Sequence, residues 1–209
     1  MKSWVIAFIL AASTVLTGCG TFIKSDVTSF HDWPSELADK SFVFERTKEQ
    51  NDSLEYLNYE NLVRDELQRL GFVQAPANTK PALKVSISYS INGRDVREVY
   101  PVVLNPYPYW YGPAWRGYYG PYHGPFYDPF WFGPPIVETR VSQYQLFTRR
   151  LHIAISRMSD GKKLWEATVV SEGSNGNLAA VMPYMVRSAF ADFPGKSGVP
   201  RQIELKMDQ

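Results

Sequence analysis

The sequence has little cysteine: Cys19 is the only one in 209 residues. An intramolecular disulfide is therefore excluded, and so is a small fold held together by bridges. Hydrophobic residues make up 44% of the chain, which is enough to bury one core of ordinary size. The same composition argues against a wholly disordered protein.

An excess of charge of either sign is also missing. The chain has 22 basic and 21 acidic side chains, and loss of Lys2 with a leader would leave 21 of each. Bulk nucleic-acid binding depends on a large basic excess, so we expect no nucleic-acid partner. The same balance gives little support for attraction of the protein to anionic lipid.

Motifs that carry chemistry are scarce. The chain has no phosphate-binding G-x-x-x-x-G-K-[ST], and Ser174 lacks the G-x-S-x-G frame of a nucleophile elbow. The three histidines, His31, His123 and His152, lie far apart, and none has a second ligand at metal spacing. We therefore expect no catalytic residue, no metal and no cofactor apart from a covalent lipid, and we expect that the protein is not an enzyme.

Two groups of charged residues are interpreted as solvent-facing. One group consists of carboxylates on or just before a helix, whose alternative role would be general acid and base. The other consists of basic residues around a hairpin, whose alternative partners would be acidic glycan or lipid phosphate. The carboxylates are Glu55, Glu60, Asp65 and Glu66, and the basic residues are Arg149, Arg150, Arg157, Lys162 and Lys163.

Hydrophobic runs long enough to span a membrane comfortably are absent from the N-terminus. Thirteen mostly apolar residues run from Trp4 to Leu16, after Lys2 and before a group of small residues. A buried N-terminal helix would need a polar stripe at helical spacing, which this segment lacks. The pattern predicts a secretory signal peptide over residues 1–18.

Leu16-Thr17-Gly18-Cys19 resembles the lipobox of bacterial lipoproteins. The resemblance implies cleavage before Cys19, covalent N-acyl and diacylglycerol groups on that cysteine, and a short tether over residues 19–25. Each buried CH₂ contributes about 0.8 kcal/mol, so three acyl chains would hold the protein at the membrane permanently. Gly20 in place of Asp implies the outer membrane, and we expect the domain to face the periplasm.

Residues 26–209 are predicted to form a single α+β domain with an insert. Short turns between strands, and helices that are apolar on one side, favour an antiparallel sheet with two helices packed on one face, a two-layer sandwich. Asp160-Gly161 predicts a β-hairpin, whereas Asn92-Gly93 is expected to end a strand. Strands are predicted at 26–33, 41–46, 83–91 and 201–205, and helices at 58–70, capped by Asn58 or Asn61, and at 182–193, with Pro183 in its first turn.

The lipobox, the hairpin "DGKKLWEATVVSEG" and the helix ending "AFADFPG" together resemble the DUF4136 family of bacterial envelope lipoproteins. The resemblance extends from about Asp26 to the C-terminus, apart from an aromatic insert. It implies an α+β domain of unassigned activity, often with a Tyr/Gly/Pro-rich loop of variable length. No catalytic residues come with the family.

The insert at about 104–135 contains thirteen aromatic residues, eight prolines and five glycines. Proline and glycine at this density exclude a regular helix or a central strand. Arg116 and Asp128 are its only charged residues, so we expect something apolar to cover its rings. Three coverings remain open: the sheet of the same domain, a protein or glycan partner, and the membrane interface.

These features favour a non-catalytic binding or structural module for envelope maintenance. We expect the membrane, through the lipid anchor, and an envelope protein or glycan as partners. The alternative is a peptidoglycan-active or other envelope hydrolase. The candidate binding surface consists of aromatic residues of the insert: Tyr109, Trp110, Trp115, Tyr118, Tyr119, Phe130 and Trp131.

Overall fold

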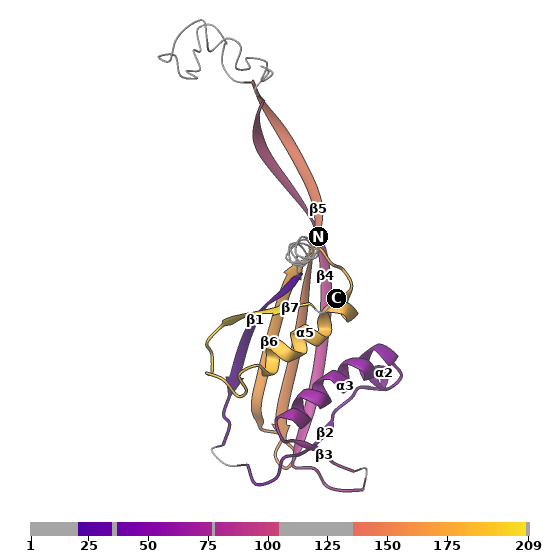
Figure 1. Ribbon diagram of the computed structural model, residues 1–209. Helices are drawn as coiled ribbons and strands as arrows, with labels where there is room; N and C mark the ends of the chain where they lie inside the picture. Colours follow the sequence, from indigo (N-terminus) through magenta and orange to yellow (C-terminus); the bar gives the residue numbers. More distant parts are fainter. Residues whose placement is uncertain (1–20, 35–36, 77, 105–135, 208–209) are drawn as a thin grey trace, which may run out of the picture. The chain divides into compact units, whose positions relative to one another are not determined.

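The computed structural model describes residues 21–34, 37–76, 78–104 and 136–207 (Figure 1). The described residues divide into two compact units. Unit 1 contains the described residues up to Gly93 and from Leu146 onward, and unit 2 contains the described residues from Arg94 to Gln145. Within these ranges, no helix combines the length and the apolar character needed to cross a membrane.

The described strands form one sheet in the order β3-β2-β4-β5-β6-β1-β7. β1 pairs antiparallel with β6 and β7, and β5 pairs antiparallel with β6. β2 pairs parallel with both β3 and β4. The strands are β1 (Phe22–His31), β2 (Ser41–Phe44), β3 (Val73–Gln74), β4 (Leu83–Leu104), β5 (Ile136–Arg157), β6 (Lys163–Gly173) and β7 (Arg201–Lys206).

The sheet is mixed, so the predicted antiparallel sheet with two helices is wrong. Val43 of β2 lies opposite Lys84 of β4 in a parallel pair. Parallel neighbours need a long crossover connection, and here the chain between them forms helix α3 (Leu54–Arg69). A third helix, α2 (Lys48–Asn51), precedes α3 and begins with a capping box of Thr47 and Gln50.

α3 and α5 (Leu178–Phe190) lie side by side over one face of the sheet (Figure 1). α3 starts earlier than predicted because Ser53, not Asn58 or Asn61, is its N-cap and accepts a hydrogen bond from the Tyr56 backbone N–H at 3.2 Å. α5 also starts earlier, so Pro183 lies inside the helix rather than in its first turn.

The core of unit 1 lies between these helices and the sheet. The fully buried Trp165 of β6 stacks on Phe190 of α5, with ring centroids 5.3 Å apart. The odd-numbered positions of β4 and β5 supply much of the sheet side of this core, because side chains alternate between the two faces of a strand. They include Leu83, Val85, Ile87, Leu151, Ile153 and Ile155.

The two predicted turns have different outcomes. The hairpin at Asp160-Gly161 is confirmed: β5 and β6 pair across it, and Gly161 has a φ of 71°, which favours glycine. The expected end of a strand at Asn92-Gly93 is wrong, because β4 continues to Leu104. The backbone of both residues is extended there, and the strand passes from unit 1 into unit 2.

Candidate functional site

Unit 2 contains a two-stranded ribbon, built from residues 94–104 of β4 and 136–145 of β5. The Tyr144 hydroxyl donates a hydrogen bond to the Glu98 carboxylate across the ribbon, with 2.8 Å between Oη and Oε1. This bond raises the pKa of Tyr144, because ionisation of the phenol would break it. The contact also places even-numbered residues of both strands on one face.

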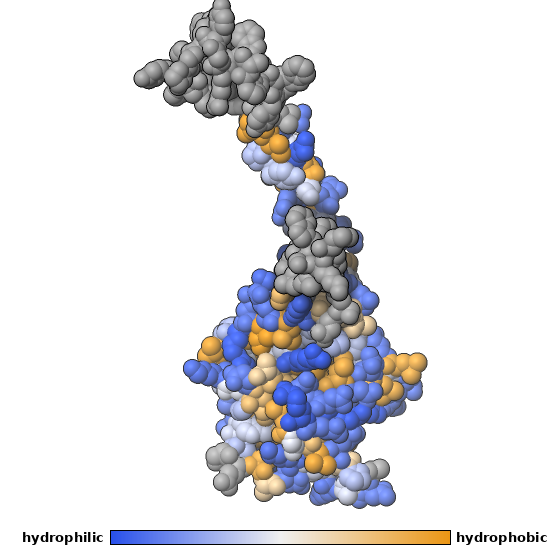
Figure 2. All heavy atoms as spheres, viewed as in Figure 1, coloured by the Kyte–Doolittle hydropathy of each residue, from blue (hydrophilic) through white to orange (hydrophobic). Residues whose placement is uncertain are grey.

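Four valines occupy odd-numbered positions on the opposite face, which we call the valine face. Their exposed fractions are 60% for Val99, 61% for Val103, 56% for Val137 and 44% for Val141. Figure 2 shows apolar atoms interspersed with hydrophilic ones along the strands. In unit 1 the odd-numbered positions of β4 and β5 are buried under helices, whereas here no described residue covers them.

Such a ribbon is an unusual element to leave in water. The ribbon continues two strands of the sheet, but the described residues give it neither a third strand nor a layer over its apolar face, and such support is what stabilises a sheet in water. Contiguous exposed apolar side chains in a folded protein usually mark an interaction surface. The valine face is therefore the strongest candidate for a binding surface among the described residues.

The charges of the ribbon are balanced. Three arginines and three acids are interspersed along its two strands, so its polar side chains attract neither a strongly basic nor a strongly acidic partner. A hollow of about 550 Å³ lies at one end of the ribbon and is lined by Asp95, Val96, Arg97, Gln143, Tyr144 and Gln145. The charged residues are Arg94, Asp95, Arg97, Glu98, Glu138 and Arg140.

The binding surface predicted from the sequence lies outside the described residues, as does Cys19. That surface comprises Tyr109, Trp110, Trp115, Tyr118, Tyr119, Phe130 and Trp131. The valine face was missed because Asn92-Gly93 was interpreted as the end of a strand. The β-branched residues in "VREVYPVVL" and "IVETRV", on either side of the insert, were the signal that could have predicted it.

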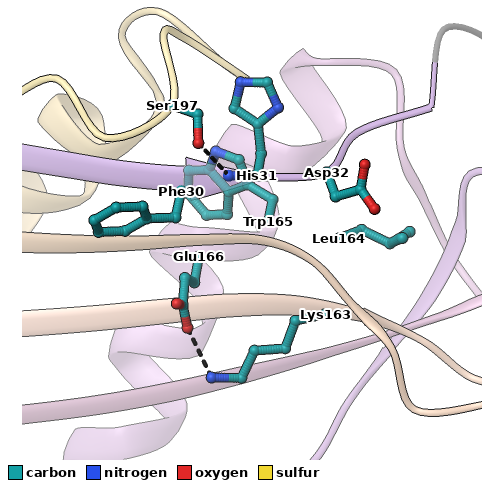
Figure 3. A pocket seen from close by; sticks show the side chains of 8 residues that line it. All are labelled: Phe30, His31, Asp32, Lys163, Leu164, Trp165, Glu166 and Ser197. Atoms are coloured by element: carbon teal, nitrogen blue, oxygen red, sulfur yellow. Dashed lines mark hydrogen bonds and ion pairs between the residues drawn. The ribbon is translucent and has the colours of Figure 1, made fainter.

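A second candidate is a shallow pocket of about 200 Å³ in unit 1 (Figure 3). It is notable because Ser197, His31 and Asp32 lie together in it, the residue types of a hydrolase triad. The lining residues are Phe30, His31, Asp32, Lys163, Leu164, Trp165, Glu166 and Ser197.

The hydrogen bonds in this pocket do not form a nucleophile and base pair. Ser197 Oγ accepts from the backbone N–H of His31 at 3.2 Å, not from its ring. His31 Nε2 instead donates to the Gly195 carbonyl at 3.0 Å. Lys162 donates a hydrogen bond to the Asp32 carboxylate in a surface ion pair, and this bond lowers the pKa of Asp32. An activated serine needs its hydroxyl held by the imidazole, which this arrangement does not provide.

Two charged residues that were interpreted as solvent-facing are buried. Glu60 has no exposed side-chain surface and accepts hydrogen bonds from Arg46 and Arg64 at 2.6 and 2.7 Å. Arg149 is 1% exposed and donates to the carbonyls of Ser171 and Asn175. Burial lowers the pKa of Arg149. The solvent-facing interpretation is wrong for both residues, because their hydrogen-bond partners allow these charges to be buried, and most of those partners are distant in sequence.

The histidines give no metal site among the described residues. His31 and His152 are half-buried strand residues, as expected, and His152 Nδ1 lies 3.3 Å from Thr168 Oγ1. His123 falls outside the described ranges. In those ranges, no three side chains of His, Cys, Asp or Glu gather closely enough to hold a metal ion.

Comparisons with known proteins identify a family but no activity. A family model described as "Domain of unknown function (DUF4136)" matches residues 26–195. No curated protein matches the chain. Among solved structures, a PDZ domain protein from Parabacteroides distasonis ATCC 8503 is similar, with a TM-score of 0.46 and 16% identity. The match covers 93% of this chain and 41% of that one, and a likeness this weak carries no argument about fold or function.

Proposed function

This chain belongs to the DUF4136 family, and from that premise we propose that it is a lipoprotein of the bacterial outer membrane that faces the periplasm. In this proposal the protein is a non-catalytic binding or structural module for envelope maintenance. Its partner is an envelope protein or glycan.

The observation that carries the binding role is the valine face of unit 2. Its four valines are 44% to 61% exposed on a two-stranded extension of the sheet, over which the described residues place no further layer. In this proposal the partner supplies that layer. The aromatic residues from Tyr109 to Trp131 remain a proposed second part of the same surface, since they lie between the two strands in sequence.

The lipid anchor is proposed from the lipobox, and the start of β1 adds a constraint. β1 begins at Phe22, within the tether expected over residues 19–25. Three residues span at most about 10 Å, so unit 1 would lie next to the lipid headgroups. Phe22 is 55% exposed, and an aromatic ring at this position suits the membrane interface.

Among the described residues, no arrangement favours the alternative of a peptidoglycan-active or other envelope hydrolase. The residues that would best support it are Ser197, His31 and Asp32. The Ser197 hydroxyl accepts a hydrogen bond from a backbone N–H, and the His31 imidazole donates one to a carbonyl, so the two side chains do not form a nucleophile and base pair. We therefore keep the binding module as the proposed function.

The binding role is tested by capture from envelope extracts. Tagged full-length protein would be purified with its partners, and its cosedimentation with isolated peptidoglycan would be measured. We expect Val99→Thr with Val103→Thr to lose most of the bound partner, because the hydroxyls weaken apolar contacts while β-branching is kept. Val96→Thr with Val102→Thr is the matched control on the other face of the same strand. Equal capture by both double variants would contradict the proposal.

A further inference from the structure

We infer that the shallow pocket beside Phe30 binds one sugar ring of a glycan. The pocket has a volume of about 200 Å³ and lies where the end of β1 meets the start of β6. It belongs to unit 1, whereas the valine face belongs to unit 2. The inference therefore goes beyond the proposed function and concerns a site of its own.

The first observation is an exposed aromatic ring at the side of the pocket. Phe30 is 54% exposed and lies opposite Glu166 in the antiparallel pair of β1 with β6. Side chains alternate along a strand, so both point away from the face on which Trp165 stacks on α5. Figure 3 shows Phe30 and Asp32 on opposite sides of the pocket. An exposed ring of this kind is an apolar platform for the C–H face of a sugar ring.

The second observation is the mixture of donors and acceptors around the pocket. Ser197 Oγ accepts from the His31 backbone N–H, which leaves the hydroxyl hydrogen of Ser197 available to a ligand. Lys163 Nζ donates to Glu166 Oε2 at 2.7 Å and has further hydrogens to donate. Glu166 Oε1 has no partner among the described residues and can accept. A sugar hydroxyl both donates and accepts, so neighbouring hydroxyls match this mixture.

The third observation is that the charges at the pocket are paired. Asp32 forms an ion pair with Lys162, and Glu166 forms one with Lys163. Two acids and two bases leave no net charge, so a strongly charged ligand gains little from this site. A neutral ligand that is rich in hydroxyls suits it better.

The pocket is poorly suited to an extended peptide. A peptide that adds to a sheet needs unpaired main-chain groups at an edge. Here the two strands pair with each other, with His31 opposite Trp165, so a ligand must bind through side chains. The volume is also below the roughly 300 Å³ at which pockets for drug-sized molecules begin. One ring of a longer glycan is the occupant that agrees with this size and with the paired backbone.

The experiment titrates the chain from residue 19 onward, with Cys19→Ser so that no lipid is attached. The probes are tetrameric oligosaccharides of glucose and of N-acetylglucosamine, and binding is followed through the backbone amide signals in NMR spectra. We expect saturable shifts at Phe30, Asp32 and Glu166 with at least one tetramer. Sorbitol has hydroxyls but no ring, and tetra-alanine is a peptide, so neither should cause saturable shifts.

Substitution of Phe30 tests the aromatic platform. Phe30→Ala should weaken binding of the tetramer about tenfold, whereas Phe30→Tyr keeps the ring and should change the dissociation constant less than about twofold. Phe22→Ala is the matched control, because Phe22 is 55% exposed near the other end of the same strand. It should also change the dissociation constant less than about twofold. Far-UV circular dichroism checks that each variant keeps its fold.

The outcomes separate this inference from the proposed function. The absence of saturable shifts with both tetramers overturns the inference, and so do equal losses in Phe30→Ala and Phe22→Ala, because the sugar then binds elsewhere. Tetra-alanine or sorbitol bound as tightly as the tetramers overturns it as well. In each of these cases the proposed function survives if Val99→Thr with Val103→Thr still abolishes capture of the envelope partner.

Discussion

At the residue scale, Arg149 shows how unit 1 holds a charge in its interior. Its guanidinium donates to two main-chain carbonyls, those of Ser171 and Asn175, just before α5 begins. Gly173 belongs to the same arrangement, since a Cβ there would lie only 2.8 Å from Arg149 Nη2. The buried side chain therefore fixes the path of the chain that leads from β6 into α5.

We expect Arg149→Met to lower the free energy of unfolding by about 2 kcal/mol, because the two carbonyls lose their donors. Arg150 is exposed and adjacent, so Arg150→Met is the matched control and should change stability by less than about 0.5 kcal/mol. Urea denaturation followed by tryptophan fluorescence measures both. Similar losses in the two variants would show that the buried hydrogen bonds of Arg149 contribute little.

At the element scale, periodicity predicted most strands and both long helices, but not how the strands pair. The alternation of β4 and the Asp160-Gly161 turn are local signals, and they were interpreted correctly. The parallel pairing of β2 with β4 depends on the crossover through α3, which links residues about forty positions apart. Short turns elsewhere favoured an antiparallel sheet, although the strand, helix, strand order already indicated a parallel pair.

The ends of α3 give a sharper test of element boundaries. The structure assigns the N-cap to Ser53, whereas the sequence favoured Asn58 or Asn61. We expect Ser53→Ala to lower the free energy of unfolding by about 1 kcal/mol, through loss of the hydrogen bond to the Tyr56 N–H.

Asn58→Ala is the control for this measurement. Asn58 is exposed in the helix interior, so its replacement should be neutral or slightly stabilising. Thermal unfolding followed by circular dichroism compares the two variants. A larger loss for Asn58→Ala than for Ser53→Ala would place the start of the helix where the sequence first suggested.

At the scale of the whole molecule, the binding surface predicted from the sequence lies outside the described residues, and the valine face was not predicted. The aromatic residues of the insert stand out in the sequence because Tyr, Trp and Pro rarely occur at that density. The valines on either side of the insert in sequence are common strand residues, and only the passage of β4 beyond Gly93 shows that no described element covers them. Exposure depends on which elements pack together, which composition alone does not specify.

The central claim is that this is a lipid-anchored protein of the outer membrane that works by binding. Its anchoring and its location are tested most directly by intact-mass spectrometry and membrane fractionation of the protein from its native host. We expect a mature chain that begins at Cys19, carries N-acyl and diacylglycerol groups and cofractionates with the outer membrane. Gly20→Asp should move it to the inner membrane, and Cys19→Ser should leave it unlipidated. An unmodified Cys19, or a leader still attached to the wild-type protein, would contradict the account.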